Sequence, residues 1–367
     1  MKFIVPLYEP SIGLQEKKNV NECLNTNWIS SRGKFVKEFE NKFKKYVGVK
    51  YAVSVCNGTA ALHLALLALN IGKNDEVLVP SFTYVASVNS IKYVNAKVKF
   101  LDIKLSNWQV DENLIQQNIK KNTKALIVPH IYGQIANIEK IKKICKRNKI
   151  YLIEDCAEAF GTYYKKKHAG SFGDVSTFSF FGSKTITTGE GGMVLTNNKS
   201  LASKIDRLKM VGVVKNKYYW HNMIGYNYRM TNICAAIGCA QMKKSSILLK
   251  KKRKIFEYYK KYSKNLPIRY HEEVKGTTHS YWLVSILLHK KGIRNKLIKY
   301  LKKYRIETRP CFYPVHTMPM YRENTKLKYP ISEYISRNGI NLPSGSDLKI
   351  NQIRYVIKYI KKFLEKK

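Results

Sequence analysis

One lysine of this chain stands apart from its many other basic residues. Lys184 follows the aromatic run 178–181 and is the only lysine or arginine between Phe172 and Asn197. Schiff-base chemistry needs a lysine amine that is enclosed and partly desolvated, and this segment is suited to enclose one. The glycines that follow fit neither the spacing of a P-loop nor that of a dinucleotide-binding loop.

Two carboxylates follow another strand-like run. Asp155 ends the apolar stretch 151–155, and Glu158 comes three residues later. A carboxylate at the end of a buried strand is costly unless it is paired, and a cationic ring nitrogen is one possible partner. A solvated loop acid is the simpler alternative, and the two interpretations stay open at this point.

A third candidate is the turn Asn57-Gly58-Thr59, which lies between a strand-like run and an apolar helix. The first turn of a helix presents unpaired N–H groups and the positive end of the helix dipole, which suits a phosphate. The simpler alternative is that Thr59 only caps the helix.

The elements that must position these residues alternate between strands and helices. Short β-branched runs are separated by helical patterns, and the strands are apolar without alternation, which indicates a mostly parallel sheet covered on both faces. In such sheets ligands bind at the carboxyl ends of the strands. We expect strands at 51–55, 76–80, 98–102, 125–130, 151–155, 176–180 and 193–196, and helices at 59–69, 84–94, 111–120 and 138–148.

The pattern changes near residue 241. A basic helix (241–264), a strand (280–288), a helix (294–304), a proline-rich loop (309–319) and a terminal helix (348–364) predict a smaller α+β domain. We expect a large α/β domain over 13–245 and a small domain over 246–367, completed by the N-terminal segment 1–12.

Composition limits the possible functions. The 367 residues include 67 Lys+Arg and 25 Asp+Glu, a net charge of +42, and 44% are hydrophobic. The charge alone suggests nucleic acid or another polyanion, but the apolar content predicts an ordinary globular protein whose charge is solvated. Seven scattered cysteines without a C-x-x-C pair favour a reducing cytoplasm and no zinc site. The sequence predicts no metal site, signal peptide or membrane span.

These motifs, in this order, resemble the DegT/DnrJ/EryC1/StrS family of sugar-nucleotide aminotransferases, and the resemblance covers nearly the whole chain. It implies the fold type I, aspartate aminotransferase-like architecture: a large seven-stranded sheet domain and a small C-terminal domain. The matching stretches are 27–31, 57–59, 62–69, 79–84, 154–159, 178–193, 225–232, 307–310 and 312–321.

The resemblance implies pyridoxal 5'-phosphate as cofactor. Lys184 then holds it as a Schiff base and moves the proton to and from the substrate carbon. Asp155 pairs with the pyridine nitrogen, Glu158 lies near the 3-hydroxyl, and Tyr84 stacks on the ring. The resemblance also implies that the phosphate is bound by Gly58, Thr59 and Ser179 and, from a neighbouring subunit, by Asn227.

The resemblance is less specific about the substrate. Arg229 is a candidate for the sugar nucleotide's phosphates, with a structural salt bridge as the alternative. Arg309, Tyr313 and His316 lie on a loop that is expected to border the substrate. The alternative is packing between domains, which is preferred for Tyr313.

The implied reaction transfers an amino group from L-glutamate to C4 of a 4-keto-6-deoxy sugar nucleotide. The leading substrate is GDP-4-keto-6-deoxy-D-mannose, which would give GDP-perosamine for a surface polysaccharide. UDP- or dTDP-4-keto-6-deoxy-D-glucose is the close alternative, and a basic nucleic-acid-binding protein on the same fold is a remote one. The stretches 134–136 and 212–214 depart from the family pattern and weaken the choice of substrate.

Overall fold

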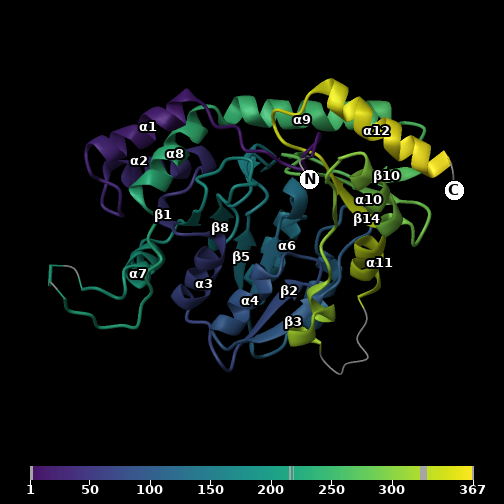
Figure 1. Ribbon diagram of the computed structural model, residues 1–367. Helices are drawn as coiled ribbons and strands as arrows, with labels where there is room; N and C mark the ends of the chain where they lie inside the picture. The colour runs from purple at the N-terminus through teal and green to yellow at the C-terminus, as the bar shows by residue number, and fades with distance from the viewer. Residues whose placement is uncertain (1–2, 215, 218, 323–328, 366–367) are drawn as a thin grey trace.

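The computed structural model describes residues 3–214, 216–217, 219–322 and 329–365 (Figure 1). Its main sheet has seven strands in the order β1-β9-β8-β5-β4-β2-β3. All neighbours pair in parallel except β9, which is antiparallel to both β1 and β8. In chain order the strands are β1 (Tyr51–Val55), β2 (Glu76–Pro80), β3 (Lys97–Leu101), β4 (Thr123–Pro129), β5 (Tyr151–Asp155), β8 (Val175–Ser179) and β9 (Gly192–Thr196).

Helices cover both faces of this sheet, and the predicted mostly parallel sheet is confirmed. Along β4, Leu126 and Val128 face one core, whereas Ala125 and Ile127 face the other. One face carries α2 (Lys34–Val47), α6 (Ile138–Arg147) and α8 (Asn232–Lys243), and the opposite face carries α3 (Gly58–Ala68), α4 (Ala86–Tyr93) and α7 (Lys199–Lys209). The remaining elements of this part are α1 (Leu14–Asn25), α5 (Glu112–Asn118) and the 3-10 turn η1 (Ile131–Gly133).

A second, smaller sheet lies in the C-terminal part, with the order β10-β12-β14-β13. It comprises β10 (Ile268–Tyr270), β12 (Val284–Leu288), β13 (Arg309–Pro310) and β14 (Gly339–Leu342). The helices here are α9 (Ser245–Tyr262), α10 (Arg294–Lys303), α11 (Pro330–Asn338) and α12 (Ile350–Glu365), and α9 and α12 lie along the upper edge of Figure 1. Short elements complete the fold: β6 (Tyr163–Tyr164), β7 (Lys167–His168), β11 (Thr277–Thr278), η2 (Val315–Thr317) and η3 (Pro319–Tyr321).

The N-terminal segment packs with this C-terminal part. Val5 is fully buried in the same core as β12, α10 and α12, and it forms a parallel bridge with Ile306. The expected division into domains, with a boundary at 245/246 and residues 1–12 completing the small domain, stays a prediction.

Two expected elements are wrong in their bounds. The basic helix expected at 241–264 is two helices, because α8 ends at Lys243 and α9 begins at Ser245. The strand expected at 280–288 begins only at Val284, because Tyr281 has a φ of 50°, which no extended strand accommodates. Within the described residues, no helix combines the length and apolar character that crossing a membrane requires.

An aromatic cluster fills the core between α2 and the sheet. Phe43 is fully buried, and its ring centroid lies between 4.9 and 5.9 Å from those of four other phenylalanines. These are Phe39, Phe160, Phe178 and Phe180. The cluster therefore fixes the end of β8, from which the chain continues to Lys184.

Replacing Phe43 with alanine is expected to lower the free energy of unfolding by about 3–5 kcal/mol, because it leaves a cavity among four rings. Urea unfolding followed by circular dichroism measures this loss. Lys37→Ala, on the exposed side of the same helix, is the control and should change it by less than about 0.5 kcal/mol. Equal effects of the two substitutions would contradict the role of the cluster.

Candidate active site

A cavity of about 430 Å³ opens at the carboxyl ends of β4, β5 and β8. This is the edge of a parallel sheet where ligands bind. Eight of the twelve predicted site residues line it: Gly58, Thr59, Tyr84, Asp155, Glu158, Ser179, Lys184 and Arg309. They come from segments up to about 250 residues apart in sequence, so the fold, and not local spacing, brings them together.

The N-terminus of α3 forms one wall of the cavity. The side chain of Asn57 accepts a hydrogen bond from the backbone N–H of Ala60 at 2.8 Å, so Asn57 caps this helix and Thr59 does not. A Cβ atom on Gly58 would lie 2.8 Å from the Cβ of Ser179, which explains the need for glycine. The helix end and β8 therefore approach closely and present N–H and hydroxyl groups suited to a phosphate.

Asp155 lies at the end of β5, and its side chain is fixed on two sides. Its Oδ2 accepts a hydrogen bond from the Ser87 hydroxyl at 2.7 Å, and its Oδ1 accepts one from the backbone N–H of Ala157 at 3.1 Å. A carboxylate can accept about four hydrogen bonds, so capacity remains for a donor in the cavity. A cationic ring nitrogen fits that position.

Lys184 and Glu158 form the charged centre of the cavity. The Nζ of Lys184 lies 3.5 Å from the Oε1 of Glu158 and 4.0 Å from the ring centroid of Trp282. The Oε2 of Glu158 accepts a hydrogen bond from the backbone N–H of Tyr132 at 2.7 Å. Burial raises the pKa of Glu158 to about 7, although Lys184 and this hydrogen bond oppose the shift. Near neutral pH this carboxyl group can therefore hold or release a proton.

Tyr84 and Arg309 lie at the mouth of the cavity. The Tyr84 side chain is largely exposed, with its ring centroid 5.9 Å from that of Phe312. Arg309 is exposed as well, and its Nη2 lies 3.2 Å from the Oε1 of Glu307. Both side chains are placed to meet a ligand that enters from outside.

Four predicted residues do not line this cavity. Arg229 donates two hydrogen bonds to the Oδ1 of Asn227, at 3.1 and 3.0 Å, and lines a separate pocket of about 180 Å³. Tyr313 packs against Arg294, with the guanidinium carbon 5.6 Å from the ring centroid. The substrate roles of Arg229 and Tyr313 therefore stay predictions.

His316 links two parts of the chain. Its Nδ1 lies 2.6 Å from the Ser81 hydroxyl, just after β2, and its Nε2 lies 3.6 Å from Glu333 on α11. Burial lowers the pKa of His316, with Glu333 opposing the shift. His316 thus joins the residue after β2 to α11, and its expected place beside the substrate stays a prediction.

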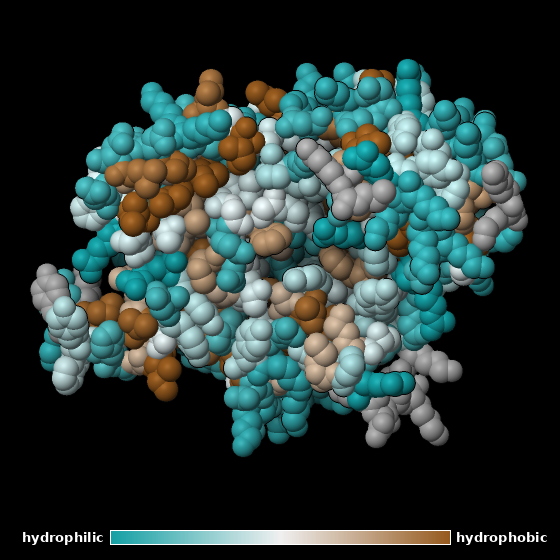
Figure 2. All heavy atoms as spheres, in the orientation of Figure 1, coloured by the Kyte–Doolittle hydropathy of each residue, from teal (hydrophilic) through white to brown (hydrophobic). Residues whose placement is uncertain are grey.

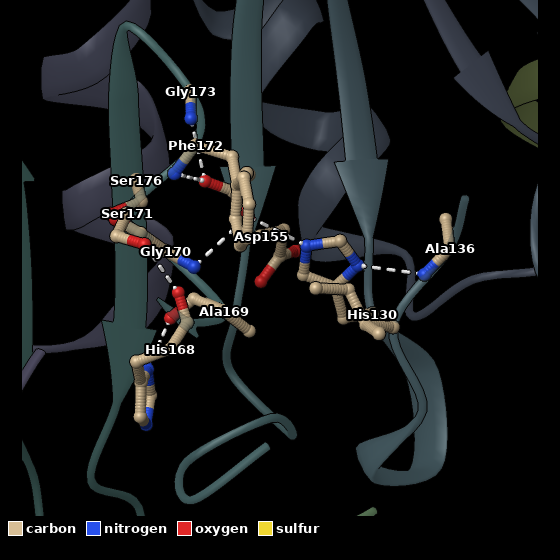
Figure 3. Close-up of polar contacts among 12 residues, drawn as sticks. His130, Ala136, Asp155, His168, Ala169, Gly170, Ser171, Phe172, Gly173 and Ser176 are labelled. Atoms are coloured by element: carbon tan, nitrogen blue, oxygen red, sulfur yellow. Dashed lines mark hydrogen bonds and ion pairs between the residues drawn. The ribbon is translucent and has the colours of Figure 1, made fainter. Parts of the chain in front are cut away.

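The sequence analysis missed a buried pair beside the site. His130 and Glu154 are both fully buried, with Nε2 and Oε2 3.0 Å apart. Together with Cys156 they bring three potential metal-ligand atoms within 4.8 Å of one another. However, the Glu154 oxygens also accept hydrogen bonds from the backbone N–H groups of residues 170, 172 and 173 (Figure 3). These hydrogen bonds stabilise the buried charge of Glu154.

The fold and the cavity together define an α/β enzyme of the aminotransferase class. A Streptococcus pneumoniae protein assigned as a sugar aminotransferase, solved in its PLP form, matches with a TM-score of 0.94 at 26% identity, covering 99% of each chain. The Helicobacter pylori aminotransferase involved in pseudoaminic acid biosynthesis matches with a TM-score of 0.93 at 27% identity over 100% of each chain.

The chain belongs to the DegT/DnrJ/EryC1/StrS aminotransferase family, whose model matches residues 10–361. It is 50% identical to the GDP-perosamine synthase of Escherichia coli O157:H7 over 100% of both chains. It is 48% identical to the GDP-perosamine synthase of Vibrio cholerae over 98% of this chain and 99% of that one. The family resemblance expected from the motifs is confirmed.

The raised pKa of Glu158 predicts a pH-dependent stability. As pH rises from 4.5 to about 7, the unfolded chain loses this proton first, so folding becomes less favourable in the wild type. Glu158→Gln removes the titration. The free energy of unfolding of the wild type minus that of the variant should therefore fall across this range.

Urea unfolding of the cofactor-free proteins at intervals between pH 4.5 and 8 measures this difference. Glu257→Gln on the exposed face of α9 is the control and should give a constant difference. A constant difference for Glu158→Gln as well would show that burial does not raise the pKa of this group.

Proposed function

We propose that this protein transfers the amino group of L-glutamate to C4 of GDP-4-keto-6-deoxy-D-mannose, with pyridoxal 5'-phosphate as cofactor, and so forms GDP-perosamine for a surface polysaccharide. The observation that carries the proposal is the cavity that places Lys184 against Glu158, beside Asp155 and the N-terminus of α3. Identity of about one half with GDP-perosamine synthases over the full length supports the choice of substrate.

The residues of the cavity fit the cofactor. When bound, pyridoxal phosphate supplies an electron sink next to the reacting carbon. In this proposal Asp155 holds the ring nitrogen in its protonated form, and Glu158 lies at the ring hydroxyl. The phosphate is held by the first turn of α3 and by Ser179, whose close approach requires Gly58. Tyr84 covers the ring from the mouth of the cavity.

Lys184 is the proton carrier in this proposal. As a free amine, its Nζ removes a proton from the α-carbon of glutamate and later delivers one to C4 of the sugar. The side chain of Lys184 is only 14% exposed, and the Trp282 ring covers it, so bulk water is kept from the reacting atoms. Glu158 stands 3.5 Å away and balances the charge of the ammonium form.

The departures from the family pattern at 134–136 do not face the cavity. Gln134 is fully buried, and its Nε2 donates a hydrogen bond to the backbone carbonyl of Glu272 at 2.9 Å. Gln134, which directly follows η1, thus holds the backbone of residue 272 against this turn. Residues 134–136 therefore do not take part in the choice between GDP-, UDP- and dTDP-linked sugars in this proposal.

We also propose a homodimer in which Asn227 completes the neighbouring site. Asn227 is exposed and lies outside the cavity of its own chain. Apolar side chains are exposed at the α1–α2 end of the molecule, where Figure 2 shows a brown patch; Leu24 and Ile29 are 53% and 48% exposed. A surface of this kind is typical of a protein–protein interface.

The positive charge is concentrated away from the cavity. Helices α9, α10 and α12 carry sixteen lysines and arginines but two acidic residues. The cavity lining holds Lys184 and Arg309 against Asp155, Glu158 and Glu190. This distribution supports an enzyme with a charged outer surface over a protein that binds nucleic acid at this cavity, because the described lining residues form no basic groove there.

Turnover of GDP-, UDP- and dTDP-linked 4-keto-6-deoxy sugars with L-glutamate, read as amino-sugar mass, tests the substrate. The GDP-mannose derivative is expected to be preferred, and Lys184→Ala is expected to lose at least about 10³-fold in rate together with the visible absorption band of the lysine-bound cofactor. A Lys37→Ala control should keep both. Preference for a UDP or dTDP substrate would overturn the perosamine assignment.

Mixing two inactive variants tests the shared site. Lys184→Ala and Asn227→Ala should each be impaired alone, but a refolded equal mixture should regain up to about a quarter of wild-type activity, because half of the dimers then contain one intact site. Light scattering of the same samples gives the oligomeric state. A monomer, or a mixture no more active than the sum of its parts, would contradict the shared site.

A further inference from the structure

The main chain at the lysine is held by two side chains from outside the large sheet. The indole Nε1 of Trp282 donates a hydrogen bond to the carbonyl of Ser183 at 2.7 Å, and the Tyr8 hydroxyl donates one to the carbonyl of Lys184 at 2.5 Å. Two consecutive carbonyls are thus fixed from two directions. We call this arrangement the carbonyl clamp.

Tyr8 is itself firmly anchored to the C-terminal part. The backbone N–H of Leu7 donates to Glu307 at 2.9 Å, and the carbonyl of Leu7 accepts from the backbone N–H of Ser344 at 2.8 Å. The Tyr8 ring lies under the amine of the fully buried Lys252, with Nζ 4.9 Å from its centroid. Lys252 also donates to the Ser344 carbonyl at 2.6 Å.

Trp282 is anchored by aromatic stacking. Its ring is nearly parallel to that of Tyr132, with 6.3 Å between centroids and 10° between planes. Tyr132 in turn stacks on Phe312 at 5.2 Å and provides the N–H that holds Glu158. Trp282 lies two residues before β12 of the small sheet. Its ring therefore lies beneath the lysine amine while its N–H holds the neighbouring carbonyl.

We propose that Tyr8 and Trp282 are positioning residues for Lys184, and that they fix the base of its side chain to the small sheet. Only the expected effect of these two residues on turnover rests on the proposed function. Both hydrogen bonds are partly buried, and a carbonyl withdrawn from water without a donor is unfavourable, so each bond favours one conformation of the 183–184 backbone. With the backbone fixed, only the four-carbon side chain moves when the amine reaches different reacting atoms.

The clamp also explains a structural need for the N-terminal segment. Tyr8 lies 176 residues before the lysine that it contacts, on a segment bonded to Glu307 and Ser344. The aromatic side chains of Tyr8 and Trp282 thereby fix the position of the lysine relative to the small sheet. Loss of either donor should loosen the 181–188 loop without unfolding the protein.

Tyr8→Phe tests the clamp with the smallest change, since it removes one hydroxyl and keeps the ring beneath Lys252. Backbone amides of residues 181–188 in the cofactor-free protein should exchange with deuterium about fivefold faster than in the wild type. The loaded enzyme should show a lower kcat at unchanged KM, and the pH at which its visible band titrates should shift. Trp282→Phe should produce the same exchange effect at Ser183 and a larger band shift, because the indole face is also lost.

Tyr321→Phe is the matched control, because it removes another buried hydroxyl, which donates to Asn89 at 2.5 Å away from the lysine. It should leave exchange, band and kcat unchanged. Exchange at 181–188 in Tyr8→Phe equal to that in the control would overturn the clamp. Absence of any transamination by the wild type would instead refute the proposed function, while the exchange result would still decide the clamp.

Discussion

A buried carboxylate that is fully hydrogen-bonded holds the site together. Glu154 is completely inaccessible to solvent, and its oxygens accept four hydrogen bonds of 2.7–3.0 Å from His130 and from the backbone of residues 170, 172 and 173. Burial by itself would raise the pKa of Glu154, but these donors outweigh it and lower the pKa. The charge is therefore kept inside the protein, where Glu154 on β5 is bonded to His130, just after β4, and to the loop 170–173 that leads into β8.

The active site depends on this junction because neighbouring residues of a strand face opposite ways. Glu154 points into the packed loop, so Asp155 points toward the cavity, where Ser87 and Ala157 orient it. The loop that Glu154 holds also determines where β8 begins, and β8 leads through Ser179 to the lysine. Burying the Glu154 carboxylate without these hydrogen-bond donors would be strongly unfavourable. The end of β4, the strand β5 and the start of β8 are therefore fixed relative to one another.

Much of this architecture could be predicted from the sequence, because it follows from apolar strands and from turn residues at their ends. The seven strands, the lysine segment and the acidic pair after β5 were all expected. What local sequence does not encode is contact between distant segments. Tyr8 and Trp282 reach the site from the N-terminal and C-terminal parts, and nothing in their neighbours in sequence indicates this. The break between α8 and α9 was missed for the same reason. At this turn the side chain of Lys244 bonds to Ser11 of the N-terminal segment and to Glu16 of α1.

The chemistry of the cavity follows from how its few charges are enclosed. Burial brings the pKa of Glu158 to about 7, so near neutral pH this residue is neither a fixed anion nor a fixed acid. The Trp282 ring centroid lies 4.0 Å from Nζ, and the electron-rich face of an aromatic ring attracts a cation. The positive charge of Lys184 opposes the rise in the pKa of Glu158, so the protonation of this carboxyl group depends on the charge beside it. A glutamine at position 158 would preserve the shape of the cavity but could neither take up nor release a proton, so the acid is the group whose charge responds to a cation in the site.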